Sequence, residues 1–114
     1  MTTIYKIVSA YLWHEAERDG VFHGSPVDIK DGFIHFSTAE QVVETAAKHF
    51  ADQRDLLLLH VDADRLGAPL KWEPSRGGAL FPHLYGALAV AAVIRVDPLP
   101  LAADGRHQFP PLDV

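Results

Sequence analysis

A histidine and two hydroxyl side chains stand close together in the segment 31–41, which reads DGFIHFSTAEQ. The apolar residues around His35 favour a strand, and because alternate side chains of a strand share a face, His35 and Ser37 lie on the same side. Ser37 and Thr38 are each followed three residues later by Glu or Gln, a pattern typical of a helix N-terminus. Unpaired amides at a helix N-terminus favour an anionic ligand. The segment therefore predicts an imidazole, two hydroxyls and such amides in one small site.

The same residues also fit a purely structural role, since a hydroxyl at a helix N-terminus often serves only as a cap. The sequence leaves both interpretations open. Three further places combine polar side chains with apolar neighbours, namely Lys6 in IYKI, Trp72 and Glu73 in LKWEPS, and His83 and Tyr85 in FPHLYG. The pKa of Glu73 has two possible outcomes, because the neighbouring Trp72 would desolvate the carboxylate and raise it, whereas pairing with Arg76 would lower it.

Other kinds of site are not favoured by the spacing of the residues. The seven histidines include no HxH or HxxxH pair, so a metal site would need distant segments, and we expect none. The absence of cysteine excludes thiolate ligands and disulfides. No GxSxG elbow is present for a serine hydrolase, and no glycine-rich turn follows an expected strand, which argues against a dinucleotide-binding fold. We interpret His49 and His60 as structural residues.

Size and charge limit the class of protein. A chain of 114 residues is long enough for one domain with its own core. The net charge of −5 provides no broad basic surface, so we expect no DNA binding. No apolar run approaches the roughly 18 residues of a membrane span, and the first residues do not resemble a signal peptide. We therefore expect a cytoplasmic protein with a small-molecule ligand and no membrane partner.

Strands and helices are mixed along the chain, as in α+β domains. Periodicity predicts helices at residues 10–19 and 38–51 and a short helical turn at 62–66. Strands are expected at residues 3–8, around His35, and at 56–61, 70–73, 79–85 and 88–96. Residues 20–30 read as a long loop, and residues 97–114, with four of the eight prolines, as an extended surface tail. We predict a single compact domain over residues 1–114, with a curved, mainly antiparallel sheet and two main helices.

Five strings along the chain together resemble one family of proteins. They are IYKI, DGFIHFSTAEQ, LLLLHVD, LKWEPS and FPHLYGAL. With them the chain resembles, over about residues 4–96, the DUF952 family of small bacterial and plant proteins. The order of strand, helix, loop and then GFIHFST entering a helix is also similar to the ADP-ribosyltransferase superfamily, which includes RNA 2′-phosphotransferases that consume NAD. This second resemblance implies an ADP-ribosyltransferase-like fold.

The superfamily resemblance also implies an activity. It suggests an NAD- or nucleotide-utilising transferase in which NAD is a substrate and the nicotinamide glycosidic bond is cleaved. The catalytic candidates are His35, Glu73 and His83, and the ligand-binding candidates are Tyr5, Lys6, Ser37, Thr38, Trp72 and Tyr85. Two alternatives stay open: a non-catalytic domain that binds a small anion or nucleotide in the same pocket, and a protein-interaction domain that uses the proline-rich tail.

Overall fold

The computed structural model describes residues 2–112, with the side chain of Arg76 left outside the description. Within this range the three α-helices are α1 (Ala10–Asp19), α2 (Pro26–Asp31) and α3 (Ala39–His49), with short 3₁₀ helices at Ala63–Arg65, Arg76–Gly78 and Val90–Ala92. The strands are β1 (Thr3–Ser9), β2 (Val21–Phe22), β3 (Ile34–His35), β4 (Leu56–Asp62), β5 (Leu70–Ser75), β6 (Ala79–Leu84), β7 (Leu88–Ala89) and β8 (Val93–Pro98).

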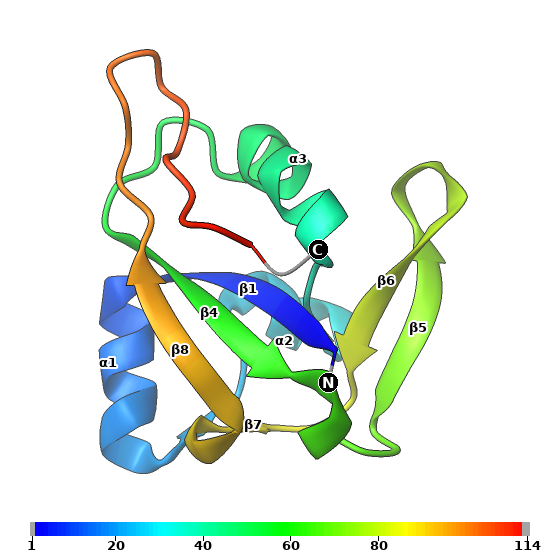
Figure 1. Ribbon diagram of the computed structural model, residues 1–114. Coiled ribbons are helices and arrows are strands. Elements are labelled where there is room, and N and C mark those ends of the chain that lie inside the picture. Colours follow the sequence, from blue (N-terminus) through cyan, green and yellow to red (C-terminus); the bar gives the residue numbers. More distant parts are fainter. Residues whose placement is uncertain (1, 113–114) are drawn as a thin grey trace.

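Within residues 2–112, the paired strands are all antiparallel. One sheet has the order β1–β4–β8, a second has the order β3–β6–β5, and β2 pairs with β7. Tyr5 of β1 forms an isolated antiparallel bridge with Ser37, which follows β3, so the first two sheets meet at this point. Figure 1 shows the β5–β6 hairpin standing away from the β1–β4–β8 sheet.

The central strands separate two apolar clusters. Because β1 alternates its side chains, Ile4 and Val8 pack on one face with Trp13 of α1. Tyr5 and Ile7 pack on the opposite face with α3 and with Leu58 of β4. The radius of gyration, 13.2 Å, is that of one compact domain of this length. The structure thus confirms a compact α+β domain built on antiparallel strands, with α1 and α3 as its two main helices.

The predicted loop at residues 20–30 is wrong, because it contains β2 and α2. Ser25 and Asp28 form a capping box at the start of α2, and Pro26 occupies the first helical turn. The helix has only six residues and ends at Gly32, which adopts a left-handed conformation with φ of 87°. So short a helix completes less than two turns, so hydrophobic periodicity does not reveal it.

Two predicted strands and the tail also differ from the structure. The strand around His35 comprises two residues, and the expected strand at 88–96 is divided by a 3₁₀ helix into β7 and β8. Beyond β8 the chain runs back beside α3 (Figure 1), where Leu99 is fully buried and Phe109 and Leu112 pack on the α3 cluster. Leu99, Phe109 and Leu112 therefore anchor this segment to the core, while other residues of it, such as Asp104 and Arg106, are exposed at the surface. None of the helices in residues 2–112 is long and apolar enough to cross a bilayer.

Candidate functional site

A cavity of about 500 Å³ lies between the β5–β6 hairpin and the body of the domain. Its volume falls in the range of small-molecule sites. Polar side chains from six elements or their ends reach its wall, namely Lys6, Asp31, His35, Ser37, Thr45, His49, Ser75 and His83. Tyr5, Ile7, Val27, Phe36, Phe50 and Phe81 complete the lining. Two of the expected catalytic histidines therefore share one cavity.

His35 lies between two carboxylates of α2. Its Nδ1 atom is 2.6 Å from Oδ1 of Asp28, and its Nε2 atom is 2.9 Å from Oδ2 of Asp31. The backbone N–H of His35 also donates to Asp28, at 3.1 Å. Both the ring and the backbone of His35 are therefore fixed by the short helix that precedes β3.

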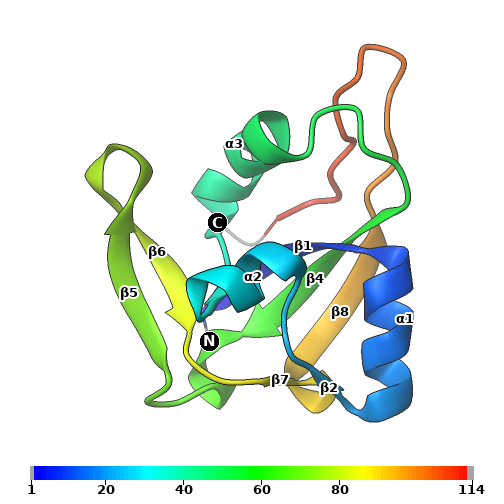
Figure 2. The same ribbon diagram turned by 180° about the vertical axis from the view of Figure 1, so that it is seen from behind.

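Asp28 is almost completely buried and holds this corner of the site together. Both of its oxygens contact the ammonium of the buried Lys6, at 3.0 and 2.9 Å, and Oδ2 accepts a hydrogen bond from the backbone N–H of Ser25. Burial alone would raise the pKa of Asp28, but the bonds from His35, Lys6 and Ser25 outweigh it and lower that pKa to about 2. Burial lowers the pKa of Lys6, and the Asp28 carboxylate opposes that shift. Figure 2 shows α2 lying over β1, next to the end of β6.

His83 of β6 forms a second carboxylate–imidazole pair. Its Nδ1 atom is 2.8 Å from Oε1 of Glu73 on β5, and the Tyr85 hydroxyl donates to the same oxygen at 2.7 Å. These two hydrogen bonds, with that from His83 the stronger influence, lower the pKa of Glu73, and the bond to Glu73 raises the pKa of Tyr85. The pKa of Glu73 is therefore lowered, but the cause is hydrogen bonding from His83 and Tyr85, and the expected pairing with Arg76 lies outside the described side chains.

Phe33 links the two histidines. Its ring stacks on His83 with centroids 4.1 Å apart, and lies 4.6 Å from the His35 ring and 5.2 Å from that of Tyr85. The His35 and His83 rings are themselves edge to face at 5.6 Å. Stacking of this kind restricts how an imidazole can turn. The aromatic cluster thus fixes the orientation of both candidate catalytic histidines.

The two hydroxyls after β3 differ in position. Ser37 is buried, lines the cavity and lies 3.0 Å from the hydroxyl of Thr45. Thr38 caps α3, and its backbone N–H donates to Gln41 at 3.0 Å. Of the two possible capping boxes, the one with Gln41 is formed, and Thr38 does not line the cavity. The structural interpretation therefore fits Thr38, whereas Ser37 stays in the site.

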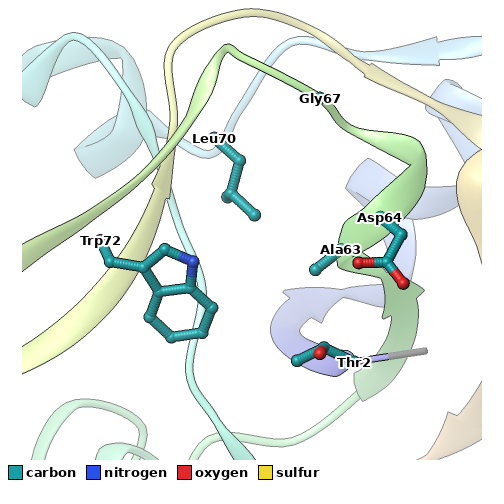
Figure 3. Close-up of a pocket in the computed structure, with 6 residues that line it drawn as sticks. All are labelled: Thr2, Ala63, Asp64, Gly67, Leu70 and Trp72. Carbon is teal, nitrogen blue, oxygen red and sulfur yellow. The ribbon is translucent and has the colours of Figure 1, made fainter.

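Trp72 does not belong to this cavity. Alternate side chains of β5 point to opposite faces, so Trp72 lies on the other side of the strand from Glu73. Its indole instead lines a separate shallow hollow of about 350 Å³ (Figure 3). Thr2, Ala63, Asp64, Gly67 and Leu70 complete that hollow. Adjacency in sequence predicts one site for Trp72 and Glu73, whereas the alternation of β5 separates their side chains.

The sequence did not predict several contributors to the cavity and its support, among them Asp28, Asp31, Phe33 and His49. Asp28 lies in the segment predicted as a loop and Asp31 directly follows it, while Phe33 is one of the apolar residues that favour a strand around His35. The pattern Ser-Pro-Val-Asp at residues 25–28 is the available signal for a helix start. His49, interpreted as structural, is exposed and lines the cavity. His60 is buried, with Nε2 2.8 Å from Oδ2 of Asp97.

A metal centre finds no support in the described residues. Across residues 2–112 no group of three or more His, Asp or Glu side chains is arranged to hold a metal ion. The carboxylates near His35 and His83 instead engage the imidazole nitrogens directly. The chemistry of the site is therefore that of paired carboxylates and imidazoles.

Comparisons with known proteins match this chain to a family model and to solved structures of a similar protein. A family model described as a protein of unknown function (DUF952) matches residues 7–96. The crystal structure of protein CC0527 from Caulobacter crescentus is 56% identical, with a TM-score of 0.91 and 94% of each chain covered. The solution NMR structure of the same protein has a TM-score of 0.85 and 56% identity, covering 95% of this chain and 93% of that one. Among curated proteins, no match was found.

Proposed function

The chain belongs to the DUF952 family, and we propose that this member is an NAD-utilising transferase with its active site in the cavity beneath the β5–β6 hairpin. In this reaction the bond between the nicotinamide nitrogen and C1′ of the ribose breaks, and its electron pair leaves with nicotinamide. An oxygen nucleophile, from water or an acceptor hydroxyl, bonds to C1′ and loses its proton. The proposal includes an ADP-ribosyltransferase-like fold for this chain.

The observation that carries the proposal is the Glu73–His83 pair. The 2.8 Å contact uses Nδ1 of His83, which leaves Nε2 for a ligand, and His83 lines the cavity. A carboxylate on Nδ1 fixes the tautomer and stabilises the imidazolium that forms when Nε2 accepts a proton. His83 is thus suited to take the proton of the nucleophile. Glu73 acts through His83 as a positioning residue, since it does not line the cavity.

Charge at the site also suits this reaction. Cleavage of the glycosidic bond places positive charge on the ribose, which nearby negative charge stabilises, and Glu73 supplies negative charge from behind His83, outside the cavity lining. Because hydrogen bonding lowers the pKa of Glu73, its carboxylate is ionised at neutral pH beside His83. Beside His83, on the adjoining cavity wall, His35 and Ser37 can hold a phosphate or ribose oxygen, and Tyr5 and Lys6 complete that wall. Tyr85 holds Glu73 from outside the cavity lining.

The test is a titration of the ¹⁵N-labelled protein with NAD, ADP-ribose and nicotinamide, together with an assay of nicotinamide release. We expect saturable shifts of amides around Ser37, His35 and His83, and release of nicotinamide that is lost in His83→Gln. Trp72→Ala is the matched control, because Trp72 lies outside the cavity. No shifts with millimolar NAD or ADP-ribose would remove the proposal.

A second candidate function is non-catalytic binding of a nucleotide or small anion. The grouping of Lys6, His35 and Ser37 on the cavity wall favours it, since an ammonium, an imidazole and a hydroxyl can hold an anion without any bond being cleaved. Saturable binding of NAD or ADP-ribose, with no nicotinamide release from wild type under any acceptor tried, would select this function over the transferase.

A further inference from the structure

We propose that Asp31 is an internal competitor for a ligand oxyanion, and that its carboxylate occupies in the free protein the position where that oxyanion binds. The position is Nε2 of His35, which lies 2.9 Å from Oδ2 of Asp31. Both residues line the cavity. The ligand group is a phosphate or carboxylate, and the inference concerns the regulation of the proposed site and rests on that proposed function.

The two carboxylates at His35 differ in how firmly they are held. Asp28 is 1% exposed and contacts Lys6, the backbone N–H of Ser25, and both the backbone N–H and the ring of His35. Removing it from its place would leave several buried donors without partners, which is costly. Asp28 is therefore a permanent part of the protein structure.

Asp31 is held far more loosely. Its side chain is 40% exposed, at the last residue of the six-residue helix α2. An ion pair at such exposure contributes little stability. The Asp31 carboxylate can thus turn into solvent while Asp28 keeps the imidazole in place.

The hydrogen bonds of His35 explain why a ligand oxyanion can replace the Asp31 carboxylate at Nε2. A carboxylate only accepts hydrogen bonds, so the contacts at 2.6 and 2.9 Å are both hydrogen bonds when each nitrogen of His35 carries a proton. Asp28 is already paired with Lys6, so Asp31 is the carboxylate that occupies the Nε2 position of His35. When Asp31 turns away, this position loses its acceptor, and a ligand oxyanion that accepts from Nε2 takes its place.

The test uses Asp31→Asn and Asp31→Ala, with Asp19→Asn as the matched control. Asp19 is exposed at the end of α1 and does not line the cavity, so this variant changes the net charge equally. The probes are inorganic pyrophosphate, inorganic phosphate and acetate, measured by titration calorimetry and by the ¹⁵N shifts of the His35 ring. Acetate and the phosphates distinguish a carboxylate ligand from a phosphate ligand.

We expect both Asp31 variants to bind at least one probe about fivefold or more tightly than wild type. Without the competing carboxylate, a larger fraction of the protein molecules has the Nε2 position of His35 open for the probe. Binding should shift the His35 Nε2 resonance, and His35→Gln added to Asp31→Asn should abolish the gain. Unchanged or weaker binding in both Asp31 variants would overturn the proposal. A gain of equal size in Asp19→Asn would also overturn it, since net charge alone would then be responsible.

The outcome is separable from that of the transferase proposal. Tighter pyrophosphate binding in Asp31→Asn, with no nicotinamide release from wild type, would keep the internal competitor and reject the transferase. Nicotinamide release that His83 controls, with no gain of oxyanion affinity in either Asp31 variant, would reject the competitor alone.

Discussion

The ammonium of Lys6 contacts both carboxylate oxygens of Asp28, at 3.0 and 2.9 Å, although the residues are 22 positions apart in the chain. Both side chains are nearly inaccessible to solvent. The pair fastens α2 to β1, and through Asp28 it fixes His35 at the cavity wall. One buried ion pair thus connects the central sheet, a short helix and the candidate site.

We predict that breaking this pair from one side destabilises the protein strongly. Lys6→Met or Asp28→Asn leaves a buried polar or charged group without its partner, which costs about 3–5 kcal/mol. Lys6→Met combined with Asp28→Leu should cost less than the sum of the single changes, since neither charge is left alone. Urea unfolding of the single and double variants measures the coupling. A loss below about 1 kcal/mol in both single variants would contradict the structural role.

The low pKa of Asp28 makes part of the stability depend on pH. Its value of about 2 lies below the ordinary value of 3.8, so as pH falls the unfolded chain takes up the proton first. The resulting stabilisation is present above pH 3.8 and is lost as pH falls towards 2. The shift corresponds to about 2 kcal/mol.

Urea unfolding between about pH 5 and pH 2, in wild type and in Asp28→Asn, measures this contribution. The difference in unfolding free energy between the two proteins should shrink by about 2 kcal/mol over that range, because the other acidic groups are common to both. A constant difference would mean that Asp28 has the same pKa in the folded and unfolded chains.

The sequence predicts features that depend on neighbouring residues, but not features that depend on contacts between residues far apart in the chain. The two faces of β1 followed from alternation alone, and Thr38 with Gln41 is a local capping signal. The Lys6–Asp28 pair is different, because it depends on where the chain brings α2 in three dimensions. Likewise, no local pattern places Phe33 between two histidines from β3 and β6. The position of Trp72, in contrast, was predictable from strand alternation.

One oxygen of Glu73, Oε1, contacts both His83 and Tyr85, and this arrangement leads to a spectroscopic prediction. The pKa of Tyr85 is raised because its hydroxyl donates to the Glu73 carboxylate. In Glu73→Gln the charge is removed, and the pKa of Tyr85 should fall back towards 10.0, its ordinary value. Ultraviolet titration of phenolate absorbance detects the change, and Tyr85→Phe identifies its signal among the three tyrosines. An identical titration curve in wild type and Glu73→Gln would show that the 2.7 Å contact does not form in solution.

The segment after β8 should behave as part of the core. Leu99 is 1% exposed and belongs to the same cluster as Tyr5 and Val42. Truncating a buried leucine removes apolar contacts and leaves a cavity, so Leu99→Ala should lower the unfolding free energy by about 2–5 kcal/mol. Leu80→Ala is the matched control, since Leu80 is 52% exposed on β6 and the same truncation there should cost under about 1 kcal/mol.

This substitution also bears on the use of the tail as a protein-binding segment. A free proline-rich tail would tolerate Leu99→Ala with no more loss than Leu80→Ala, as measured by urea unfolding. The larger loss expected for Leu99→Ala means that the segment cannot leave the body of the domain to bind a partner without exposing the cluster around Tyr5. Because Tyr5 also lines the cavity, Leu99→Ala should weaken ligand binding as well as folding, whereas Leu80→Ala should leave ligand affinity unchanged.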